Sequence, residues 1–119
     1  MKAFNINDRE FRFTDKILEG LKTVETRNSR SLDSLIGQRV GIIRTGAGKA
    51  TLVGYVTIAG VKEYSNASEF DSDHQAHLVK PGSKYYIQQG GKKYGYILEN
   101  AVRCEPQEVT ARGIVIRNI

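Results

Sequence analysis

The chain has 119 residues, of which 39% are hydrophobic and 26% are charged. This length and composition predict one soluble globular domain over residues 1–119, and they exclude a disordered tail or a two-domain protein. The 18 Lys and Arg residues outnumber the 13 Asp and Glu residues, giving a formal net charge of +5, which favours polyanionic partners without requiring one.

The cysteine content and the hydropathy pattern predict where the protein resides. Cys104 is the only cysteine, so no disulfide can form within the chain and a reducing compartment is expected. No apolar run approaches the roughly 18 residues of a membrane span, and the first residues lack the apolar region of a signal peptide. We therefore expect a cytoplasmic protein without membrane contact.

The N-terminal part of the chain predicts a strand, a helix and a second strand. Residues 3–6 alternate in hydropathy, as a strand does. Asn7 and Glu10 have capping-box spacing, so a helix is expected to begin near Asp8 and to end at Gly20 in the left-handed conformation. Its inner face would carry Phe11, Thr14, Ile17, Leu18 and Leu21.

The segment after Gly20 concentrates groups that carry chemistry. It has the sequence Leu-Lys-Thr-Val-Glu-Thr-Arg and is expected to be a strand over residues 23–27. Because residues two apart in a strand share a face, Thr23, Glu25 and Arg27 should lie together, with Lys22 at the start of that face. Val24 and Thr26 should occupy the other face. An acid, a lysine, a hydroxyl and a guanidinium would then be close in space.

The middle of the chain predicts a β-hairpin. Residues 39–45 and 50–58 are rich in β-branched residues, and residues 61–64 extend the second strand. The turn between the strands contains Gly-Ala-Gly-Lys, residues 46–49. This is not a Walker loop, because Arg44 stands where the first glycine is required and Ala50 where a hydroxyl is required. We expect a hairpin turn with Lys49 at a basic tip.

Residues 67–78 suggest one short amphipathic helix that ends before Pro81. His74 and His77 are three residues apart on it. Without a cysteine partner or a zinc-type His-Glu-x-x-His pattern, a polar helical face explains them better than a metal site. We therefore expect no metal and no cofactor.

The last third of the chain combines aromatic and basic residues. Residues 81–93 are rich in turns and place Tyr85 among lysines that include Lys84 and Lys93, the composition of a groove for single-stranded nucleic acid. Residues 94–102 predict a strand with Tyr94 and Tyr96 on one face. A closing strand is expected within residues 110–119, which contain Ile114, Val115 and Ile116.

The order of these motifs resembles the ASCH domain, a family of the PUA-like superfamily of RNA-associated barrels. The resemblance is carried by Gly20-x-Lys22-Thr23-x-Glu25-x-Arg27 after an Ile-Leu helix, by residues 37–42, and by Tyr94-Gly-Tyr-Ile-Leu-Glu-Asn100 with Val102, Glu105 and Pro106. It spans roughly residues 3–109. It implies an α+β fold, a small mixed β-barrel with one or two flanking helices and a basic cleft lined by the first motif.

The resemblance also implies that the cleft binds RNA or a nucleoside or nucleotide ligand. The binding residues would be Arg27, Arg44, Lys49, Lys84, Tyr85, Lys93 and Tyr94. Cationic groups would hold phosphates, and a tyrosine would stack on a base.

Hydrolysis is the enzymatic alternative, either of an acetylated cytidine or of single-stranded RNA. The catalytic residues would be Lys22, Thr23, Glu25 and Tyr96, with Glu25 as general base, Thr23 as oxyanion donor, and Lys22 or Tyr96 as charge stabiliser. Amidohydrolase members of the family carry threonine where this chain has Glu25. A protein-interaction module is the third possibility. The simplest alternative is that Glu25 and Arg27 only pair across the sheet.

Overall fold

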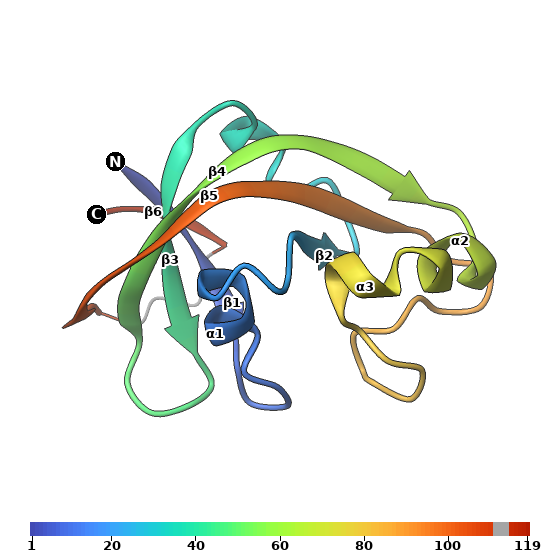
Figure 1. Cartoon of the computed structure of the whole chain (residues 1–119), viewed down its shortest axis with the longest axis horizontal. Coiled ribbons are helices and arrows are strands. Elements are labelled where there is room, and N and C mark those ends of the chain that lie inside the picture. The colour runs from blue at the N-terminus through green and yellow to red at the C-terminus, as the bar shows by residue number, and fades with distance from the viewer. Residues whose placement is uncertain (111–114) are drawn as a thin grey trace.

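The computed structural model describes residues 1–110 and 115–119 and has an open, mixed sheet. Its six strands lie in the order β2-β5-β4-β3-β1-β6 (Figure 1). They span Lys2–Asn7 (β1), Val24–Arg27 (β2), Arg39–Thr45 (β3), Thr51–Tyr64 (β4), Lys93–Glu108 (β5) and Ile116–Asn118 (β6). The predicted α+β class is confirmed. A closed barrel is not, because β2 and β6 end the strand order on opposite sides.

The expected closing strand corresponds to β6, which pairs with β1. Ile114, which was expected to belong to this strand, lies outside the described residues. β1 also pairs with β3 in parallel, whereas the other neighbouring strands are antiparallel. The parallel pairing places Asn7 opposite Thr45 and thus brings the ends of β1 and β3 together.

β4 and β5 form a long curved ribbon that spans the molecule (Figure 1). Their pairing shifts register three times, and such bulges bend and twist a sheet. Gly54 lies at one shift, where the strands approach so closely that a Cβ atom there would be 2.5 Å from the Val102 carbonyl oxygen. β2 pairs with the N-terminal part of β5, opposite residues 94–97.

The helices are short: α1 spans Phe13–Leu18, α2 Ala67–Ser72 and α3 His74–His77, with a 3-10 turn at Asp33–Leu35. The prediction that the first helix begins near Asp8 is wrong. Asn7 Oδ1 accepts from the amide of Arg9, forming a turn, and Asp8 Oδ1 accepts from the amide of Thr14. Leu21, expected on the inner face, follows the helix end at Gly20 and is 54% exposed.

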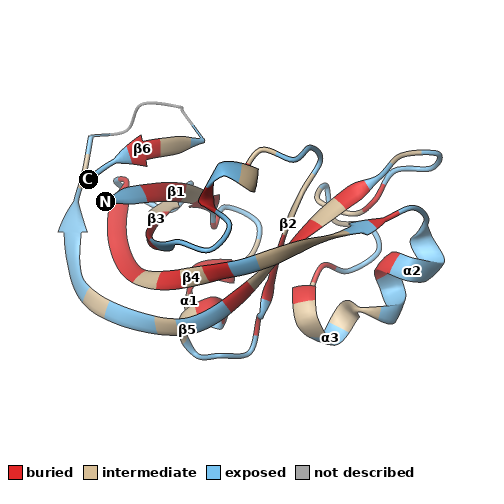
Figure 2. Cartoon of the chain, turned by 90° about the horizontal axis from the view of Figure 1, so that it is seen from above, coloured by how far each residue is buried: buried red, intermediate tan, exposed pale blue. Residues whose placement is uncertain are grey.

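The main core lies between the sheet and these helices. Figure 2 shows buried residues along β1, β3 and the adjoining half of β4, with α1 against the ribbon. Fully buried side chains in this cluster include Phe4, Ile17, Ile42 and Phe70. Each such residue contributes about 1.5–3 kcal/mol through its removal from water. α1 and the strands that flank it are thereby held in fixed positions.

The polar helical face predicted for the two histidines is contradicted at His77. The expected single helix is broken at Asp73, and His77 is fully buried. Its ring stacks on Phe70, with centroids 3.9 Å apart. After Asp73 the side chain of His77 therefore points into the core, while Gln75 stays exposed to solvent.

Candidate functional site

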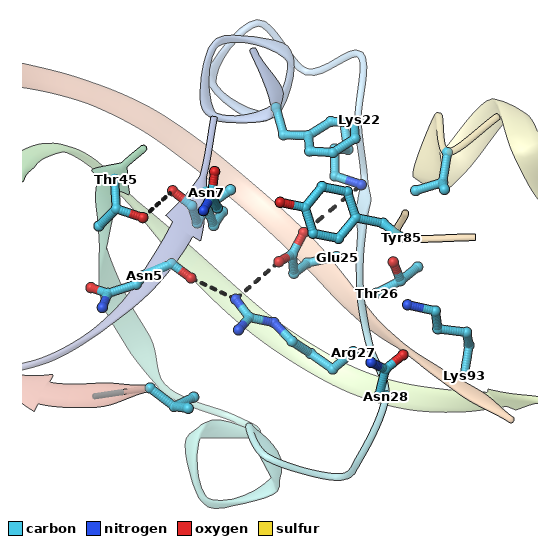
Figure 3. A pocket seen from close by; sticks show the side chains of 14 residues that line it. Asn5, Asn7, Lys22, Glu25, Thr26, Arg27, Asn28, Thr45, Tyr85 and Lys93 are labelled. Carbon is cyan, nitrogen blue, oxygen red and sulfur yellow. Dashed lines mark hydrogen bonds and ion pairs between the residues drawn. The ribbon is translucent and has the colours of Figure 1, made fainter. Parts of the chain in front are cut away.

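A pocket of about 380 Å³ opens between β1, β2 and the loop that follows α3 (Figure 3). Its polar lining comes from four segments far apart in the sequence. These residues are Asn5, Asn7, Lys22, Glu25, Thr26, Arg27, Asn28, Thr45, Tyr85 and Lys93. Ile6, Phe13, Val79 and Val115 complete the lining. From the segment of residues 20–27, Lys22, Glu25, Thr26 and Arg27 line the pocket, whereas Gly20 and Thr23 do not.

The backbone after α1 places Lys22 at the pocket. Gly20 adopts a φ of 79°, the left-handed conformation expected there, which glycine adopts at little cost. The amides of Leu21 and Lys22 both donate to the carbonyl of Lys16, so the helix end is satisfied and the chain turns sharply. Lys22 consequently precedes β2 with its side chain directed inward.

Glu25 is the central acid of the pocket. Its Oε2 lies 2.9 Å from Nη2 of Arg27, and its Oε1 lies 3.9 Å from Nζ of Lys22. The same Arg27 nitrogen donates to the carbonyl oxygen of Asn5 at 2.6 Å, which ties β2 to β1 (Figure 3). The carboxylate is therefore held between two cations, with little of its surface exposed.

Lys22 is almost completely buried, at 1% exposure. Its Nζ donates to the carbonyl of His77 at 2.5 Å and lies 4.5 Å from the centre of the Phe13 ring. Burial lowers the pKa of Lys22 to about 8; Glu25 opposes this effect, whereas Arg27 and Lys93 add to it. At neutral pH the ammonium is still the major form, but a free amine is accessible.

Lys93 and Arg27 make the pocket strongly positive. Burial lowers the pKa of Lys93, and Arg27 acts in the same direction while Glu25 opposes both. Three cationic side chains and one carboxylate line the pocket, so its formal charge is 3 − 1 = +2 when Lys22 is protonated. Arg27 Nε is buried and has no hydrogen-bond partner among the described residues.

Tyr85 forms an aromatic wall of the pocket. Its ring lies edge-on to Phe13, with centroids 6.1 Å apart, and Nζ of Lys84 lies 5.2 Å from its centre. Lys84 itself is exposed and is outside the lining. Of the predicted aromatic and basic pair on this loop, Tyr85 therefore lines the pocket and Lys84 contacts only the ring of Tyr85.

Two of the predicted catalytic residues lie outside the pocket. Thr23 is exposed, and its amide donates to the carbonyl of Ala76. It precedes β2, so its side chain does not lie on the same strand face as Glu25 and Arg27. Tyr96 is fully buried, and its hydroxyl donates to Asp33 Oδ1 at 2.7 Å. Burial and that carboxylate raise the pKa of Tyr96 to about 12. Thr26, expected on the opposite face, lines the pocket instead.

Three further predicted binding residues lie outside the lining. Arg44 lines a separate cavity with Asp8, Arg12 and Asp15. Lys49, 80% exposed, pairs with Glu108 at 3.7 Å. Tyr94 packs under the guanidinium of Arg30, at 5.6 Å from its ring centre. Lys49 is thus on the hairpin tip, as predicted, and not at the pocket.

Sequence reasoning missed the polar residues that β1 and β3 contribute, Asn5, Asn7 and Thr45. Their positions depend on the parallel pairing of β1 with β3, which no local motif signals. Thr26, in contrast, lies within the motif and Asn28 directly follows it, so the local sequence already placed both near this site.

No cluster of three or more potential metal-ligating His, Cys, Asp or Glu side chains occurs in residues 1–110 and 115–119. Within the same residues, no helix has the length and apolar character needed to cross a membrane.

Comparison with known proteins gives one family and one group of structures. The family model described as the ASCH domain matches residues 12–111. An ASCH protein from Zymomonas mobilis superimposes with a TM-score of 0.74 at 17% identity, covering 91% of this chain and 73% of that one. A substituted variant of that protein gives 0.78 at 16% identity, covering 99% and 87%. No curated protein matches the sequence. At this identity the structural similarity concerns the fold.

Proposed function

The chain belongs to the ASCH domain family, and on this premise we propose that its pocket binds RNA or a nucleotide through a phosphate group. The observation that carries the proposal is the charge of the pocket. Lys22, Arg27 and Lys93 converge on a single carboxylate, Glu25, in a cavity of about 380 Å³. Such an excess of buried positive charge is stabilised when an anion enters.

The burial of these cations favours a phosphate over a weakly held counterion. Lys22 is 1% exposed and Lys93 is 3% exposed, so each has lost most of its hydration. Hydrogen bonds from charged donors to phosphate oxygens are about twice as strong as bonds between neutral groups. Arg27 adds a guanidinium to the lining, and guanidinium groups bind phosphate in a fixed geometry.

The rest of the lining suits a nucleoside attached to that phosphate. Tyr85 presents an aromatic ring, on which a base can stack for about 1–3 kcal/mol. Thr26 and Asn28 supply hydroxyl and amide groups beside it, suited to the edge of a base or to a ribose hydroxyl. Lys84, exposed beside Tyr85, is placed to contact the next phosphate of a longer strand.

The test is the salt dependence of binding to a short single-stranded RNA, with a uridine mononucleotide and inorganic phosphate as smaller probes. Replacement of Lys93 by alanine should weaken binding and reduce the slope of log affinity against log salt by about 0.7, the value for one phosphate contact on a single strand. Lys49→Ala is the matched control, because Lys49 lies on the exposed hairpin tip. Equal effects of both substitutions, or no binding at low salt, would refute the proposal.

Hydrolysis is the second candidate, favoured by the lowered pKa of Lys22 beside Glu25. In the proposed step, Glu25 takes a proton from water, the water oxygen attacks the acetyl carbonyl of an acetylated cytidine, and Lys22 stabilises the oxyanion. The tetrahedral intermediate then collapses: the C–N bond breaks while protonated Glu25 returns its proton to the leaving nitrogen, which releases acetate and cytidine. The positions of Thr23 and Tyr96 do not support roles for them in this reaction.

Turnover of acetylated cytidine by the wild-type chain separates the two candidates. Loss of turnover in Glu25→Gln, with ligand affinity retained or increased, would identify Glu25 as the base. Affinity should increase because the substitution raises the formal charge of the pocket by one unit. Binding of RNA with no product in any sample would leave the binding function alone.

A further inference from the structure

We propose that His77 is a positioning residue for Lys22, and that protonation of the His77 ring releases Lys22 and weakens ligand binding in acid. The effect on ligand binding rests on the proposed function of the pocket, whereas the effect on Lys22 does not. His77 lies outside the motif at residues 20–27 and is 55 positions away from Lys22 in the sequence.

Both nitrogens of the His77 ring are engaged. Nδ1 lies 2.9 Å from the amide nitrogen of Val79, which can only donate, so Nδ1 is the acceptor. Nε2 lies 2.7 Å from the carbonyl oxygen of Phe70, which can only accept, so Nε2 carries the proton. This pair of contacts defines the neutral tautomer of the ring in the folded chain.

The ring holds a turn that reaches the pocket at two points. The carbonyl of His77 accepts a hydrogen bond from the ammonium of Lys22, and Val79 lines the pocket. Between them, Leu78 has a φ of 63°, in the left-handed region that a branched side chain rarely occupies. The bond from Val79 to Nδ1 closes this unfavourable turn and keeps the His77 carbonyl in place.

Protonation of the ring removes the acceptor that the turn requires. With a proton on Nδ1, the Val79 amide loses its partner and two donors face each other. The new charge would also lie near Lys22, which disfavours it, and near His74 on α3. The groups that favour the charge are Asp73 and the Phe70 carbonyl, but Asp73 is already engaged by Lys62 and by the hydroxyl of Tyr64.

The remaining groups that pack on the ring are aromatic: Phe70 stacks on it and Tyr64 meets it edge-on, at 6.0 Å between centroids. Burial and the charge of Lys22 lower the pKa of His77 below 6.5. The ring is therefore protonated only at a more acidic pH than an ordinary histidine, and its protonation breaks the hydrogen bond that closes the turn.

The predicted direction is opposite to simple electrostatics. One more positive charge close to the pocket should strengthen the binding of an anion, whereas loss of the His77–Val79 bond should weaken it by displacing the carbonyl that holds Lys22. A decrease of affinity in acid would therefore show that loss of the His77–Val79 bond outweighs the added positive charge. The RNA probe should contain only uridine, because neither its bases nor its phosphodiesters titrate in this range.

The experiment begins without a ligand, on the full-length wild-type chain. NMR would follow the Val79 amide, the His77 ring and the Lys22 side chain from about pH 8 downward, until the His77 ring has titrated. We expect the three signals to change with one midpoint, and the hydrogen exchange of the Val79 amide to accelerate beyond its ordinary pH dependence. A Lys22 signal indifferent to the His77 titration would overturn the proposal.

The matched variants are His77→Asn and His77→Phe. The amide oxygen of asparagine can replace Nδ1 as the acceptor for Val79 but does not titrate, so the acid transition of Lys22 should disappear while its neutral-pH signal is kept. Phenylalanine fills the ring volume without an acceptor, so the displaced Lys22 signal should be present at every pH. Retention of the acid transition in the asparagine variant would also overturn the proposal.

Binding of the uridine RNA then tests the functional consequence. The wild-type affinity should fall by about tenfold per pH unit below the His77 midpoint, and the asparagine variant should show no such fall. Unchanged or increasing wild-type affinity in acid would refute the regulatory part of the inference. If no RNA binds at any pH while the Lys22 signal still follows His77, the proposed function fails and the positioning role stands.

Discussion

Lys22 should give the folded chain an unusual dependence of stability on pH. Burial lowers its pKa to about 8 in the folded state, against an ordinary value of 10.5. Because one pKa unit corresponds to about 1.4 kcal/mol, folding disfavours the charged amine by about 3 kcal/mol at neutral pH. The hydrogen bond to the His77 carbonyl and the nearby Glu25 are already included in that balance.

The sign follows from proton counting. Between about pH 8 and pH 10.5 the unfolded chain holds a proton on Lys22 that the folded chain has lost. The free energy of unfolding therefore rises with pH across this window, and the cost of the buried charge is fully present below pH 8. The lowered pKa of Lys93 acts with the same sign. The raised pKa of Tyr96 acts with the opposite sign, but only above about pH 10.

Urea unfolding measured between about pH 7.5 and pH 10 would test this directly. The wild-type chain should become more stable by about 2–3 kcal/mol. Lys22→Met keeps much of the side-chain volume and removes the titrating group, so most of the rise should vanish. At neutral pH the variant should gain less than 3 kcal/mol, because the bond to the His77 carbonyl is lost and that bond is itself worth about 1.5–3 kcal/mol.

The control is Lys49→Met, which removes one positive charge at a site that is 80% exposed. It should leave the rise in place. A wild-type stability that is flat or decreasing up to pH 10, or a rise that survives in Lys22→Met, would show that Lys22 is more hydrated than the geometry indicates.

Two further predictions test the assignments made above. Tyr96→Phe should lower the free energy of unfolding by about 1–2 kcal/mol, because the bond to Asp33 is lost; ligand affinity should not change, and a large loss of binding would return Tyr96 to the site. Gly54→Ala should cost at least about 2 kcal/mol, because a Cβ there would meet the Val102 carbonyl and Leu18 Cδ2, each at 2.5 Å. Gly60→Ala is the control, since the nearest atom to its Cβ would be 3.8 Å away, and equal costs would contradict the close approach of β4 to β5.

The parts of the fold that the sequence predicted well are those decided by neighbouring residues. β3 has the predicted bounds, residues 39–45, because alternating β-branched residues lie between two turns that contain glycine. Gly20 ends its helix in the predicted conformation, since few other residues adopt a positive φ cheaply. Lys22, Glu25 and Arg27 are together in the pocket because they are close in the sequence, with Glu25 and Arg27 two residues apart on β2 and Lys22 just before it.

The parts that the sequence did not predict depend on contacts between distant segments. Asn5 reaches Arg27 only because β1 pairs with β3 and passes beside β2. His77 belongs to the core because Phe70 and Val79 satisfy both of its ring nitrogens, whereas its spacing from His74 suggested a polar face. The first helix is shorter than its periodicity implied because Asn7 and Asp8 accept from other backbone amides.

The C-terminal part of β5, residues 99–108, bears on the tendency of the chain to aggregate in crowded solution. β2 pairs with residues 94–97 only, so the outer side of residues 99–108 has no partner strand within the described part of the chain. An unpaired strand of this length is a template for aggregation. Pro106 lacks an amide hydrogen, a register shift distorts the strand between Arg103 and Gln107, and Arg103, Glu105 and Glu108 are exposed. These features resist the addition of a foreign strand, so self-association through residues 99–108 of β5 is disfavoured although the sheet is open there.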